Sequence, residues 1–534
     1  MTGEMLAKVP ARTNLVAQGF DPAVPKETVA VAPGRDPMTG QSRSSLIAGD
    51  PLRGNLVFWD RAGRLPPRPG NGWYGQPIYA LVAPNGVVTK LKRMDPGNAN
   101  RDMREYDARF YGEVQLPPDL APGQYTLMAG QVAFVFFIVK PPAKTNNGFI
   151  RVDPGTTIET IQELLTLGFN LELAPGVYYW VWSIYGPENR PLSLLSGTTI
   201  RGSGAVIRPP ADAIPNAGDE WQWCVFIANE WCVLDGLRFE LLPGMRIVQG
   251  QSAAHNLTLS HCKLTPAALS EPGPGMFVQD CEISGAGAGI WTASGGLCRR
   301  IKAYDNISSH VFVSWAADGT LALIDFHWDW TDRGPIFQPS WGDIRANLFL
   351  GCWCSNVCWS ENGCECFLCE TTADFALDDN LILHYRYDGG PGGGAAIQWD
   401  KKARNNYVRE AKIYGGSIVL WGVDASENVF EDIEVVGGYL RLGPGSLNKF
   451  INSAFCQTRA SSGGSHYIDP NWYAKWTSTV FWESEVGGGN YFKNVVFDLL
   501  PRFTPILDPN MVLLEGCWFN GENYPPEPPP ASTT

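Results

Sequence analysis

Charged residues are scarce in this sequence, and long apolar runs are missing. Only 18% of the 534 residues are charged, the net charge is −13, and lysine and arginine form no cluster. This charge has the wrong sign for binding phosphate backbones, so we do not expect nucleic acid to be a partner. A membrane-spanning helix needs about 20 predominantly apolar residues, and because no such segment is present we expect no membrane insertion.

The amino-terminal stretch MTGEMLAKVPARTNLVAQGF lacks the apolar core of a secretory signal peptide. We therefore expect a chain that is made in a cytoplasm, with its 13 cysteines mostly reduced. Glycine and proline are abundant, with 58 and 41 residues, which indicates many turns and few long helices. Some of the 20 tryptophans will pack in a core, but an exposed tryptophan offers a flat face on which a sugar can bind.

Sequence patterns divide the chain into five parts. Residues 1–45 carry proline, glycine and polar residues without periodicity, and we interpret them as an extended arm. Residues 46–144 contain short runs such as GNLVFWD and VAFVFFIVK between turn signals, a pattern typical of a small antiparallel, immunoglobulin-like β-sandwich. We expect a linker at 145–155, a long repetitive domain at 156–520 and an extended, proline-rich tail at 521–534.

The repetitive domain opens with a helix signal. In TTIETIQELLTLG (Thr156–Gly168), Ile158, Ile161, Leu164 and Leu165 recur at helical spacing, and Gly168 is a plausible stop. The segments NLELAPGVYYW and SGTTIRGSGAVIRPP follow. This order resembles the opening of right-handed parallel β-helices of the pectin-lyase-like superfamily. The resemblance implies an all-β fold, a single-stranded right-handed parallel β-helix of about a dozen coils whose open end is capped by the helix.

Apolar residues recur at fixed distances after a starting position, which we call position 0. Positions +2, +5 and +7 are mostly apolar, whereas +3, +4 and +6 are mostly polar, as a strand with one buried face requires. Steps of 26, 22 and 20 residues separate four successive starts, which suits one coil each. Asparagine at position 0 predicts a stacked ladder of amides, at Asn347, Asn380, Asn406, Asn428, Asn448 and Asn490.

Six cysteines crowd into GCWCSNVCWSENGCECFLCE (Gly351–Glu370). The repeat places most of the chain's thiols inward, with Cys262, Cys281, Cys352, Cys369 and Cys517 at +5, Cys354 at +7 and Cys366 at +2, and leaves Cys358 and Cys364 in turns. Stacked core thiols are therefore the favoured interpretation. Zinc is not favoured because two separate C-x2-C pairs are missing, and disulfides between neighbouring coils remain the alternative.

Parallel β-helices with this opening occur in pectate lyases, polygalacturonases, alginate epimerases, autotransporters and bacteriophage tailspikes, and fold alone does not choose between them. The missing signal peptide, the arm followed by a small β-domain, and the acidic, tryptophan-rich body make the chain resemble a tailspike. That resemblance implies a homotrimer in the virion tail, synthesised in the host cytoplasm and attached through its N-terminal region to other tail, baseplate or portal proteins.

A tailspike recognises a host capsule, O-antigen or lipopolysaccharide, and the resemblance extends to cleavage of that polysaccharide as a depolymerase. Two alternatives stay open. One is a stand-alone polysaccharide lyase or glycoside hydrolase of the same superfamily, and the other is a virion adhesin without catalysis.

Hydrolysis of a glycosidic bond needs two carboxylates, and outward acids on neighbouring coils, ~4.8 Å apart per coil, have suitable separations. Acids, histidines and tryptophans concentrate between residues 325 and 400. The candidate catalytic residues are Asp329, Glu361, Glu370, Asp378 and Asp379. The candidate polysaccharide-binding residues are His327, Trp330, Trp353, Trp359, His384, Arg386, Trp399 and Asp400.

The run DFALDDNLILH (Asp374–His384) resembles the paired-aspartate motif of polygalacturonases, but it lacks that family's Gly-Asp-Asp-Cys order and the later Gly-His-Gly. A hydrolase, which needs no metal or other cofactor, is favoured. A lyase would use Arg386, Lys401 or Arg404 as a base and calcium on Asp378 and Asp379. The alternatives without catalysis are that Asp378 and Asp379 stabilise a turn, and that His327 and His384 face solvent or a trimer contact.

Overall fold

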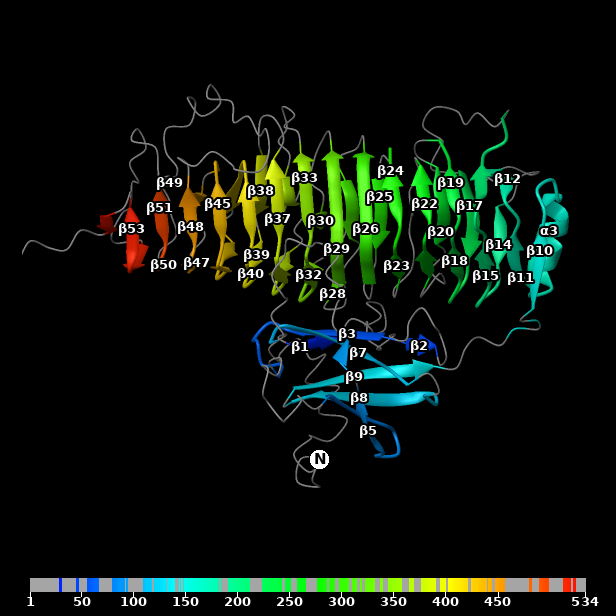
Figure 1. Cartoon of the computed structure of the whole chain (residues 1–534), viewed down its shortest axis with the longest axis horizontal. Helices are drawn as coiled ribbons and strands as arrows, with labels where there is room; N and C mark the ends of the chain where they lie inside the picture. Colours follow the sequence, from blue (N-terminus) through cyan, green and yellow to red (C-terminus); the bar gives the residue numbers. More distant parts are fainter. Residues whose placement is uncertain are drawn as a thin grey trace, which may run out of the picture.

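A β-sandwich lies beside the middle of a long parallel β-helix, and the sandwich precedes the β-helix in the sequence (Figure 1). The computed structural model describes residues 28–30, 45–47, 55–66, 79–91, 93–94, 109–117, 120–130, 132–139, 144, 146, 148–180, 182–183, 191–211, 223–242, 245–250, 257–265, 276–285, 288–292, 297–306, 310–314, 317–318, 322–331, 337–339, 344–357, 365–368, 376–389, 394–399, 402–420, 424–438, 440–443, 447–456, 480–482, 489–498, 512–519 and 522–524. Within these ranges, no helix is long and apolar enough to cross a membrane.

Two small sheets form the sandwich, with strand orders β1-β3-β7-β6 and β2-β9-β8-β4-β5. Their pairs are antiparallel except that β2 runs parallel to β9. Side chains such as Phe58, Leu127 and Phe136 form its core. The strands are β1 (Thr28–Ala30), β2 (Ser45–Ile47), β3 (Asn55–Asp60), β4 (Tyr79–Val82), β5 (Val88–Leu91), β6 (Arg93–Met94), β7 (Tyr111–Gln115), β8 (Gly123–Ala129) and β9 (Val132–Val139).

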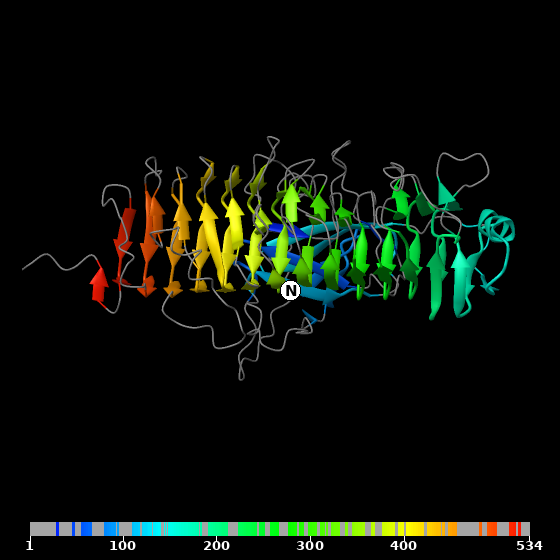
Figure 2. The same ribbon diagram turned by 90° about the horizontal axis from the view of Figure 1, so that it is seen from above.

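One sheet of 28 strands runs the length of the β-helix, and its successive coils stack as a straight row (Figure 2). Most coils contribute two strands to it, whereas β26 (Leu297–Asn306) and β29 (Ala322–Thr331) each run unbroken through both positions. Its strands are β10 (Phe149–Val152), β11 (Asn170–Leu173), β12 (Gly176–Tyr179), β15 (Thr199–Arg201), β16 (Ala205–Arg208), β18 (Val233–Asp235), β19 (Arg238–Glu240), β21 (Thr258–Ser260), β22 (Lys263–Thr265), β23 (Phe277–Gln279), β24 (Glu282–Ser284), β26 (Leu297–Asn306), β29 (Ala322–Thr331), β32 (Leu348–Leu350), β33 (Trp353–Val357), β36 (Leu381–Leu383), β37 (Arg386–Gly389), β40 (Tyr407–Arg409), β41 (Lys412–Tyr414), β44 (Val429–Glu431), β45 (Glu434–Val436), β47 (Lys449–Ile451), β48 (Ala454–Cys456), β50 (Asn490–Lys493), β51 (Val496–Asp498), β52 (Val512–Glu515), β53 (Cys517–Phe519) and β54 (Glu522–Tyr524).

Three further sheets close the coils on their other sides. One holds β25 (Ala288–Thr292), β27 (His310–Ser314), β30 (Phe337–Pro339), β34 (Glu365–Leu368), β38 (Gly394–Trp399), β42 (Gly416–Leu420), β46 (Leu440–Leu442) and β49 (Val480–Trp482). The second holds β28 (Ala317–Asp318), β31 (Ile344–Arg345), β35 (Leu377–Asp378), β39 (Ala403–Arg404) and β43 (Ala425–Ser426). The third, in the first coils, holds β13 (Trp182–Ser183), β14 (Leu192–Leu194), β17 (Trp223–Ala228) and β20 (Arg246–Gly250). The predicted right-handed parallel β-helix is confirmed.

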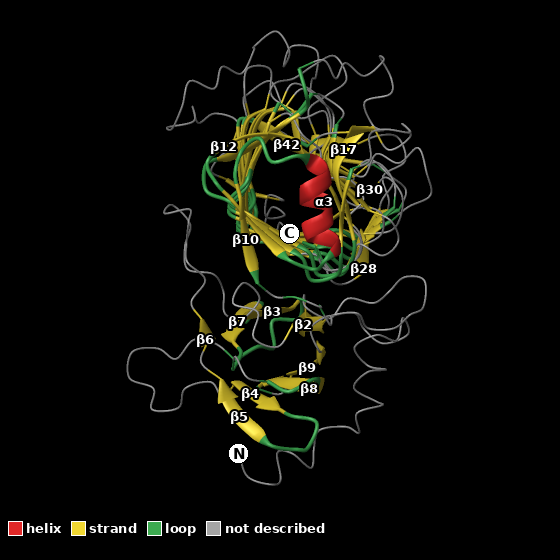
Figure 3. Ribbon diagram, turned by 90° about the vertical axis from the view of Figure 1, so that its right-hand side faces the viewer, coloured by secondary structure: helices red, strands yellow, loops and turns green. Residues whose placement is uncertain are grey.

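The helix α3 (Ile158–Thr166) covers the end of the β-helix at the first coils, as predicted (Figure 3). The Thr157 hydroxyl accepts a hydrogen bond from the Thr160 N–H, which satisfies a free amide of the first turn. Ile161 and Leu165 are buried on the apolar face. Gly168 follows at φ 87°, a conformation that costs glycine little, and ends the helix.

Three short strands lie in stretches where the sequence predicted no strand. β1 lies within residues 1–45, where an arm was expected, and it pairs with β3 of the sandwich. β10 lies in the predicted linker and pairs in parallel with β11. β54 lies in the predicted tail and pairs antiparallel with β53, which covers the outer edge of that strand. Each of these short strands forms because it pairs with a neighbouring strand, and its own sequence does not indicate that pairing.

The repeat frame is confirmed in the described coils. The asparagines at position 0 are 0 to 1% exposed, and the residues at +2, +5 and +7, such as Ile382, Tyr385 and Tyr387, are buried. Position +4 turns the chain between the two strands with a left-handed residue, for example His384 at φ 53° and Glu410 at φ 55°. Polar side chains tolerate this conformation at a corner, which explains why +4 is polar.

The asparagine ladder carries a specific stability prediction. The Asn406 side-chain oxygen accepts from the Asn380 backbone N–H and amide, and its amide donates to Leu377 O and to Asn428. Asn406→Ala therefore removes hydrogen bonds from several buried donors and acceptors, and we expect a loss of about 2–4 kcal/mol in the free energy of unfolding. Asn229→Ala, which removes one half-buried bond to Leu194 O, should lose about 1 kcal/mol.

Urea denaturation followed by tryptophan fluorescence measures both variants, with the midpoint compared at unchanged slope. If Asn406→Ala unfolds at the same urea concentration as Asn229→Ala, the ladder does not hold neighbouring coils together.

Buried thiols occupy the positions that the repeat assigns to them. Cys262, Cys281, Cys352, Cys354 and Cys517 are buried free cysteines, as are Cys224, Cys232, Cys298 and Cys456. Burial raises the pKa of the Cys232 thiol to about 12, so it carries almost no thiolate at neutral pH. Cys358, Cys364 and Cys369 lie outside the described residues, as does the side chain of Cys366.

The sandwich packs on apolar residues that point outward from the β-helix. Val57, Trp59, Phe110 and Tyr111 of the sandwich form one buried cluster with side chains at +1 and +3 of three coils, namely Ala322, Ile324, Leu348, Leu350, Leu381 and Leu383. Polar contacts surround this cluster. Trp59 Nε1 donates to Ala346 O at 3.2 Å, and Arg61 donates to the Asn405 side-chain and backbone oxygens.

Candidate functional site

The outer face of β29, β33 and β37 brings together three of the predicted binding residues. His327, Trp353 and Arg386 occupy position +6 in successive coils, and their strands pair in parallel register. The His327 and Trp353 rings stack with centroids 4.0 Å apart and an angle of 7° between planes. The Arg386 guanidinium lies 5.0 Å from the centroid of the Trp353 ring, on the side of the next coil. We call these three residues the mid-helix strip.

Two residues at +8 hold the mid-helix strip in place. Asp388 accepts from Trp353 Nε1 at 2.6 Å and from Arg386 Nε at 2.8 Å. The Ser355 hydroxyl lies 2.8 Å from His327 Nε2. Both Asp388 and Ser355 are only 7% exposed, whereas the strip residues are partly exposed. The strip is thus fixed by part-buried hydrogen bonds to two buried residues, which is the arrangement that gives a binding surface a defined shape.

The stacking changes what Trp353 can offer to a ligand. The expectation was a flat indole face on which a sugar ring could lie. One face of the indole is covered by His327 and the other by Arg386, so Trp353 presents its edge. The strip therefore offers ring edges and a guanidinium rather than an aromatic platform.

Cations flank the mid-helix strip on both sides. Lys302 precedes His327 in register, and Lys412 follows Arg386; both lysines are exposed. Position +6 thus carries no carboxylate from Lys302 to Lys412, although the chain has a net charge of −13. Beside Lys412, burial and the nearby Glu434 raise the pKa of Tyr414, so its hydroxyl stays protonated at neutral pH. This part of the surface is rich in hydrogen-bond donors.

The predicted catalytic pair, Asp378 and Asp379, lies elsewhere on the coil. Asp378 belongs to β35, accepts from the Arg404 backbone N–H at 3.0 Å and lies 3.6 Å from Arg345 Nε. Asp379 accepts from the Asn405 amide at 2.7 Å, and Asn405 in turn accepts from Arg61 of the sandwich. The strand β36 and the corner at His384 separate the pair from the strip. These contacts support the corner of the coil and its junction with the sandwich.

The same contacts bear on the calcium that a lyase would bind at Asp378 and Asp379. Calcium takes six to eight oxygen ligands, roughly, and each of these carboxylates already accepts a hydrogen bond. Arg345 adds a positive charge beside Asp378. These contacts would compete with calcium for the carboxylate oxygens. Among the residues that the structure describes, no group of three or more histidine, cysteine, aspartate or glutamate side chains could hold a metal ion.

Two predicted binding residues are buried. Trp399 at the end of β38 is 0% exposed and packs on Phe430, 5.5 Å between centroids, so the prediction that it binds polysaccharide is wrong. His384 is 4% exposed at the +4 corner, where its Nδ1 lies 2.9 Å from Glu410 Oε2. The expectation of an outward, solvent-facing His384 is wrong as well, because its side chain is buried against Glu410 at the equivalent corner of the next coil.

The remaining predicted residues are only partly covered by the structure. Asp329 and Trp330 lie on β29, where the backbone of Asp329 is in register with Ser355, and their side chains are not described. Trp359, Glu361, Glu370 and Asp400 lie outside the described residues. Asp388 and Ser355 were missed by reasoning from the sequence. A signal for them existed, because +8 has the same strand parity as +6 and therefore the same outward face.

Comparisons with known proteins find likenesses of structure only. No protein-family model matches the chain, and no curated protein matches its sequence. Tailspike protein 3 of bacteriophage CBA120 superposes with a TM-score of 0.35 and 10% identity, over 68% of this chain and 59% of that one. The catalytic domain of a GH87 α-1,3-glucanase in complex with nigerose gives 0.38 and 12%, over 87% and 90%. A family 28 exopolygalacturonase of Yersinia enterocolitica gives 0.33 and 11%, over 88% and 97%.

The chain thus spans less than two thirds of the length of that tailspike protein. With TM-scores below 0.5, these similarities neither locate a site nor assign a role to any residue. The functional roles of individual side chains must therefore be inferred from the contacts within this chain.

Proposed function

We propose that this protein binds a polysaccharide along the outer face of its β-helix and cleaves it, acting as the receptor-binding tailspike of a bacteriophage. The observation that carries the proposal is the mid-helix strip. His327, Trp353 and Arg386 come from three separate coils, stack in one row, and are fixed by hydrogen bonds to the buried residues Asp388 and Ser355. Core packing does not require such an arrangement on an outer face.

A polymer is the ligand that suits a row of this kind. Successive coils repeat every ~4.8 Å, so Lys302, the strip and Lys412 form a straight line of donors along the β-helix. An extended chain of sugar units can contact several coils at once, whereas a small molecule would touch one or two. Guanidinium and ammonium groups form strong hydrogen bonds with carboxylates and hydroxyls, which polysaccharides present at regular intervals.

For cleavage we propose hydrolysis, with Asp329 as one of the two carboxylates. Its backbone is next to Ser355 in register and immediately follows Trp328 in the coil that carries His327. Glu361 and Glu370, the other predicted acids of this region, are the candidates for the second carboxylate.

The biological setting is part of the proposal and rests on the sequence resemblance. In it the chain forms a homotrimer in the virion tail, and its N-terminal region binds other tail, baseplate or portal proteins. The host receptor is a capsule, O-antigen or lipopolysaccharide. A monomer in solution would favour the stand-alone enzyme, and binding without release of oligosaccharides would favour the adhesin.

Replacing Trp353 with alanine tests the binding surface. The substitution removes the centre of the stack and a partner of Asp388, so we expect binding to a recognised capsular or O-antigen polysaccharide to weaken about tenfold or more, ~1.4 kcal/mol. Trp518→Ala is the matched control, because Trp518 also occupies +6 of a coil, is 46% exposed and lies near the far end of the β-helix.

Biolayer interferometry on immobilised polysaccharide measures both variants, and light scattering checks that each keeps the wild-type assembly. Equal affinity of Trp353→Ala and wild type, or a loss in Trp518→Ala instead, would contradict the proposed surface.

A further inference from the structure

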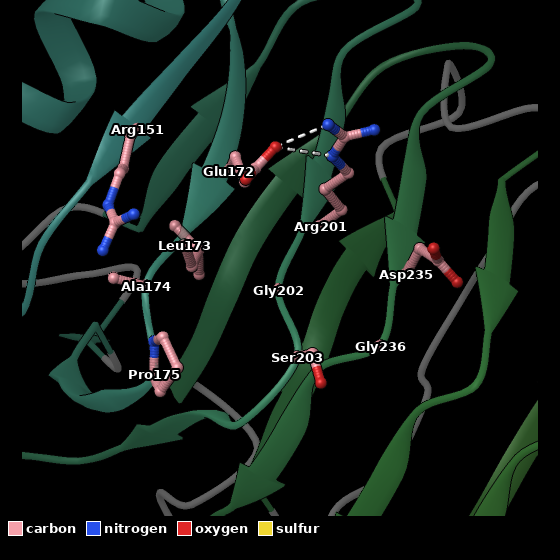
Figure 4. Close-up of a pocket in the computed structure, with 10 residues that line it drawn as sticks. All are labelled: Arg151, Glu172, Leu173, Ala174, Pro175, Arg201, Gly202, Ser203, Asp235 and Gly236. Carbon is pink, nitrogen blue, oxygen red and sulfur yellow. Dashed lines mark hydrogen bonds and ion pairs between the residues drawn. The ribbon is translucent and has the colours of Figure 1, made fainter.

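The first coils of the β-helix carry a row of charges that alternate in sign. Arg151, Glu172, Arg201 and Asp235 occupy equivalent positions on β10, β11, β15 and β18, in direct register. Neighbours in such a row are ~4.8 Å apart, so each charged residue would be expected to form an ion pair with the next one along the row. Arg201 and Asp235 do not pair with each other, and a cleft of about 410 Å³ opens at this point (Figure 4).

Arg201 and Asp235 each interact with a neighbour on the side that faces away from the other residue. The Arg201 guanidinium donates to Glu172 through Nε and Nη2 and lies 4.0 Å from the centroid of the Phe149 ring. Asp235 Oδ1 accepts from the Ser260 hydroxyl at 2.5 Å and lies 2.8 Å from His261 Nδ1. Within the described residues, Nη1 of Arg201 and Oδ2 of Asp235 have no hydrogen-bond partner. A donor and an acceptor are thus fixed in place and unused.

The floor of the cleft is bare backbone. Gly202 and Gly236 stand at the corner of their coils, where the next coil has His261. A Cβ on Gly202 would lie 2.9 Å from Leu173 Cβ, and one on Gly236 would lie 3.2 Å from Gly202 O at a φ of 69°. Glycine is therefore favoured at both positions, and the main chain beside the cleft carries no side chain there. Ser203 adds an exposed hydroxyl at the rim.

From this geometry we infer that the cleft is a second carbohydrate site, which binds one or two units of a neutral saccharide. Vicinal hydroxyls donate to Asp235 Oδ2 and accept from Arg201 Nη1 and the Ser203 hydroxyl. The volume lies within the range of about 300–1,000 Å³ that small-ligand sites occupy. Arg151 and Arg201 balance Glu172 and Asp235, so the lining has no net charge, which favours an uncharged ligand over an anion or a cation.

This site does not depend on the proposed function of the mid-helix strip. It lies in the first coils, next to α3, whereas the strip lies on β29, β33 and β37 in the middle of the β-helix (Figure 1). In a polysaccharide-processing protein such a cleft would hold a sugar unit away from the place of cleavage. In a protein without that activity it would bind the same ligand.

Saturation-transfer difference NMR on the full chain tests the inference, with the methyl glycosides of glucose, galactose, mannose and N-acetylglucosamine as probes. We expect at least one of them to receive saturation, and its affinity to change little between low and high salt because the site is neutral. Ser203→Trp fills the cleft from an exposed turn, and Asp235→Asn removes the acceptor. Each should weaken binding about tenfold or more.

Two control variants separate the possible outcomes. Arg208→Gln breaks the ion pair to Glu240, an exposed arginine–glutamate pair of the same kind outside the cleft, and should bind like wild type. In Trp353→Ala, the part of the glycoside signal that Ser203→Trp removes should remain, even where the variant has lost polysaccharide binding. The inference is overturned if no glycoside receives saturation from the wild-type protein, if Ser203→Trp and Asp235→Asn both bind normally, or if Trp353→Ala abolishes the signal.

Discussion

Replacing Asp329 with asparagine is expected to reduce the release of oligosaccharides by about 10²–10⁴-fold, the contribution that a general acid or base makes to catalysis. Asparagine has nearly the same size and cannot transfer the proton or carry the charge, so binding of the polymer should persist. The measurement is the reducing sugar released from a recognised polysaccharide, with affinity determined in parallel. Loss of cleavage with retained binding is the result that a catalytic carboxylate requires.

Asp378→Asn and Asp379→Asn provide the comparison. The sequence motif predicts that this pair is catalytic. Its contacts to Arg345, Arg404 and Asn405 instead support a role in stabilising the corner of the coil. We expect these variants to keep more than a tenth of the activity, roughly, and to lower stability by about 1 kcal/mol. The opposite pattern, with Asp329→Asn active and the pair inactive, would return the site to the sequence-based assignment.

The second large effect is expected at the junction of the sandwich and the β-helix. Arg299 forms two hydrogen bonds of 2.9 Å to Glu113, and the side chains are 12% and 3% exposed. Arg299→Ala removes both of these charged hydrogen bonds from the buried Glu113 carboxylate, and breaking such a pair costs about 3–5 kcal/mol. The neighbouring Tyr111 hydroxyl donates to Glu113 at 3.2 Å, and burial together with the charge of Glu113 raises its pKa, so it stays a neutral donor that does not replace the positive charge of Arg299.

This loss should appear as release of the sandwich from the β-helix. Limited proteolysis is expected to separate the two parts of Arg299→Ala under conditions in which the wild type stays intact. Arg300→Gln is the matched control, because Arg300 is the next residue and its pair with Asp280 is 39% and 29% exposed, where ion pairs contribute about 0–1 kcal/mol. Similar cleavage of both variants would mean that the buried pair does not hold the junction.

A double substitution separates the ion pair from the apolar contact. Replacing Arg299 with methionine and Glu113 with leucine removes both charges together, and buried pairs replaced in this way are often neutral or stabilising. We expect the double variant to resist proteolysis much better than Arg299→Ala. If the double variant is cleaved as readily as Arg299→Ala, the ion pair rather than the apolar cluster around Trp59 holds the sandwich on the β-helix.

The repeat frame made the β-helix predictable because one face of each strand is buried and the period of a strand is two. The same frame could not predict which outward-facing residues of the β-helix are covered by the sandwich. Yet the runs LFL in β32 and LIL in β36 are apolar at every position, which indicates burial on both faces. The run NLVFWD in β3 has the same property, since Phe58 faces the sandwich core and Trp59 faces the β-helix. Together these runs signal the junction.

The candidate site was predictable only where the frame applied. His327, Trp353 and Arg386 share position +6, so their alignment followed from counting residues. Trp399 lies on β38, on another side of the coil, where variable turns separate it from position 0 and no offset is fixed. The role of Asp388 depends on hydrogen bonds to Trp353 and Arg386, which a linear pattern does not contain.

Hydroxyl-radical footprinting of the intact protein with and without a recognised polysaccharide tests most directly whether the mid-helix strip is the binding surface. The two tryptophans Trp353 and Trp518 both stand at +6 on the outer face, and each reports on its own part of the β-helix. We expect the polysaccharide to slow oxidation of Trp353 and to leave Trp518 unchanged. Unchanged oxidation of Trp353 at saturating polysaccharide, or protection of Trp518 in its place, would contradict the proposed binding surface.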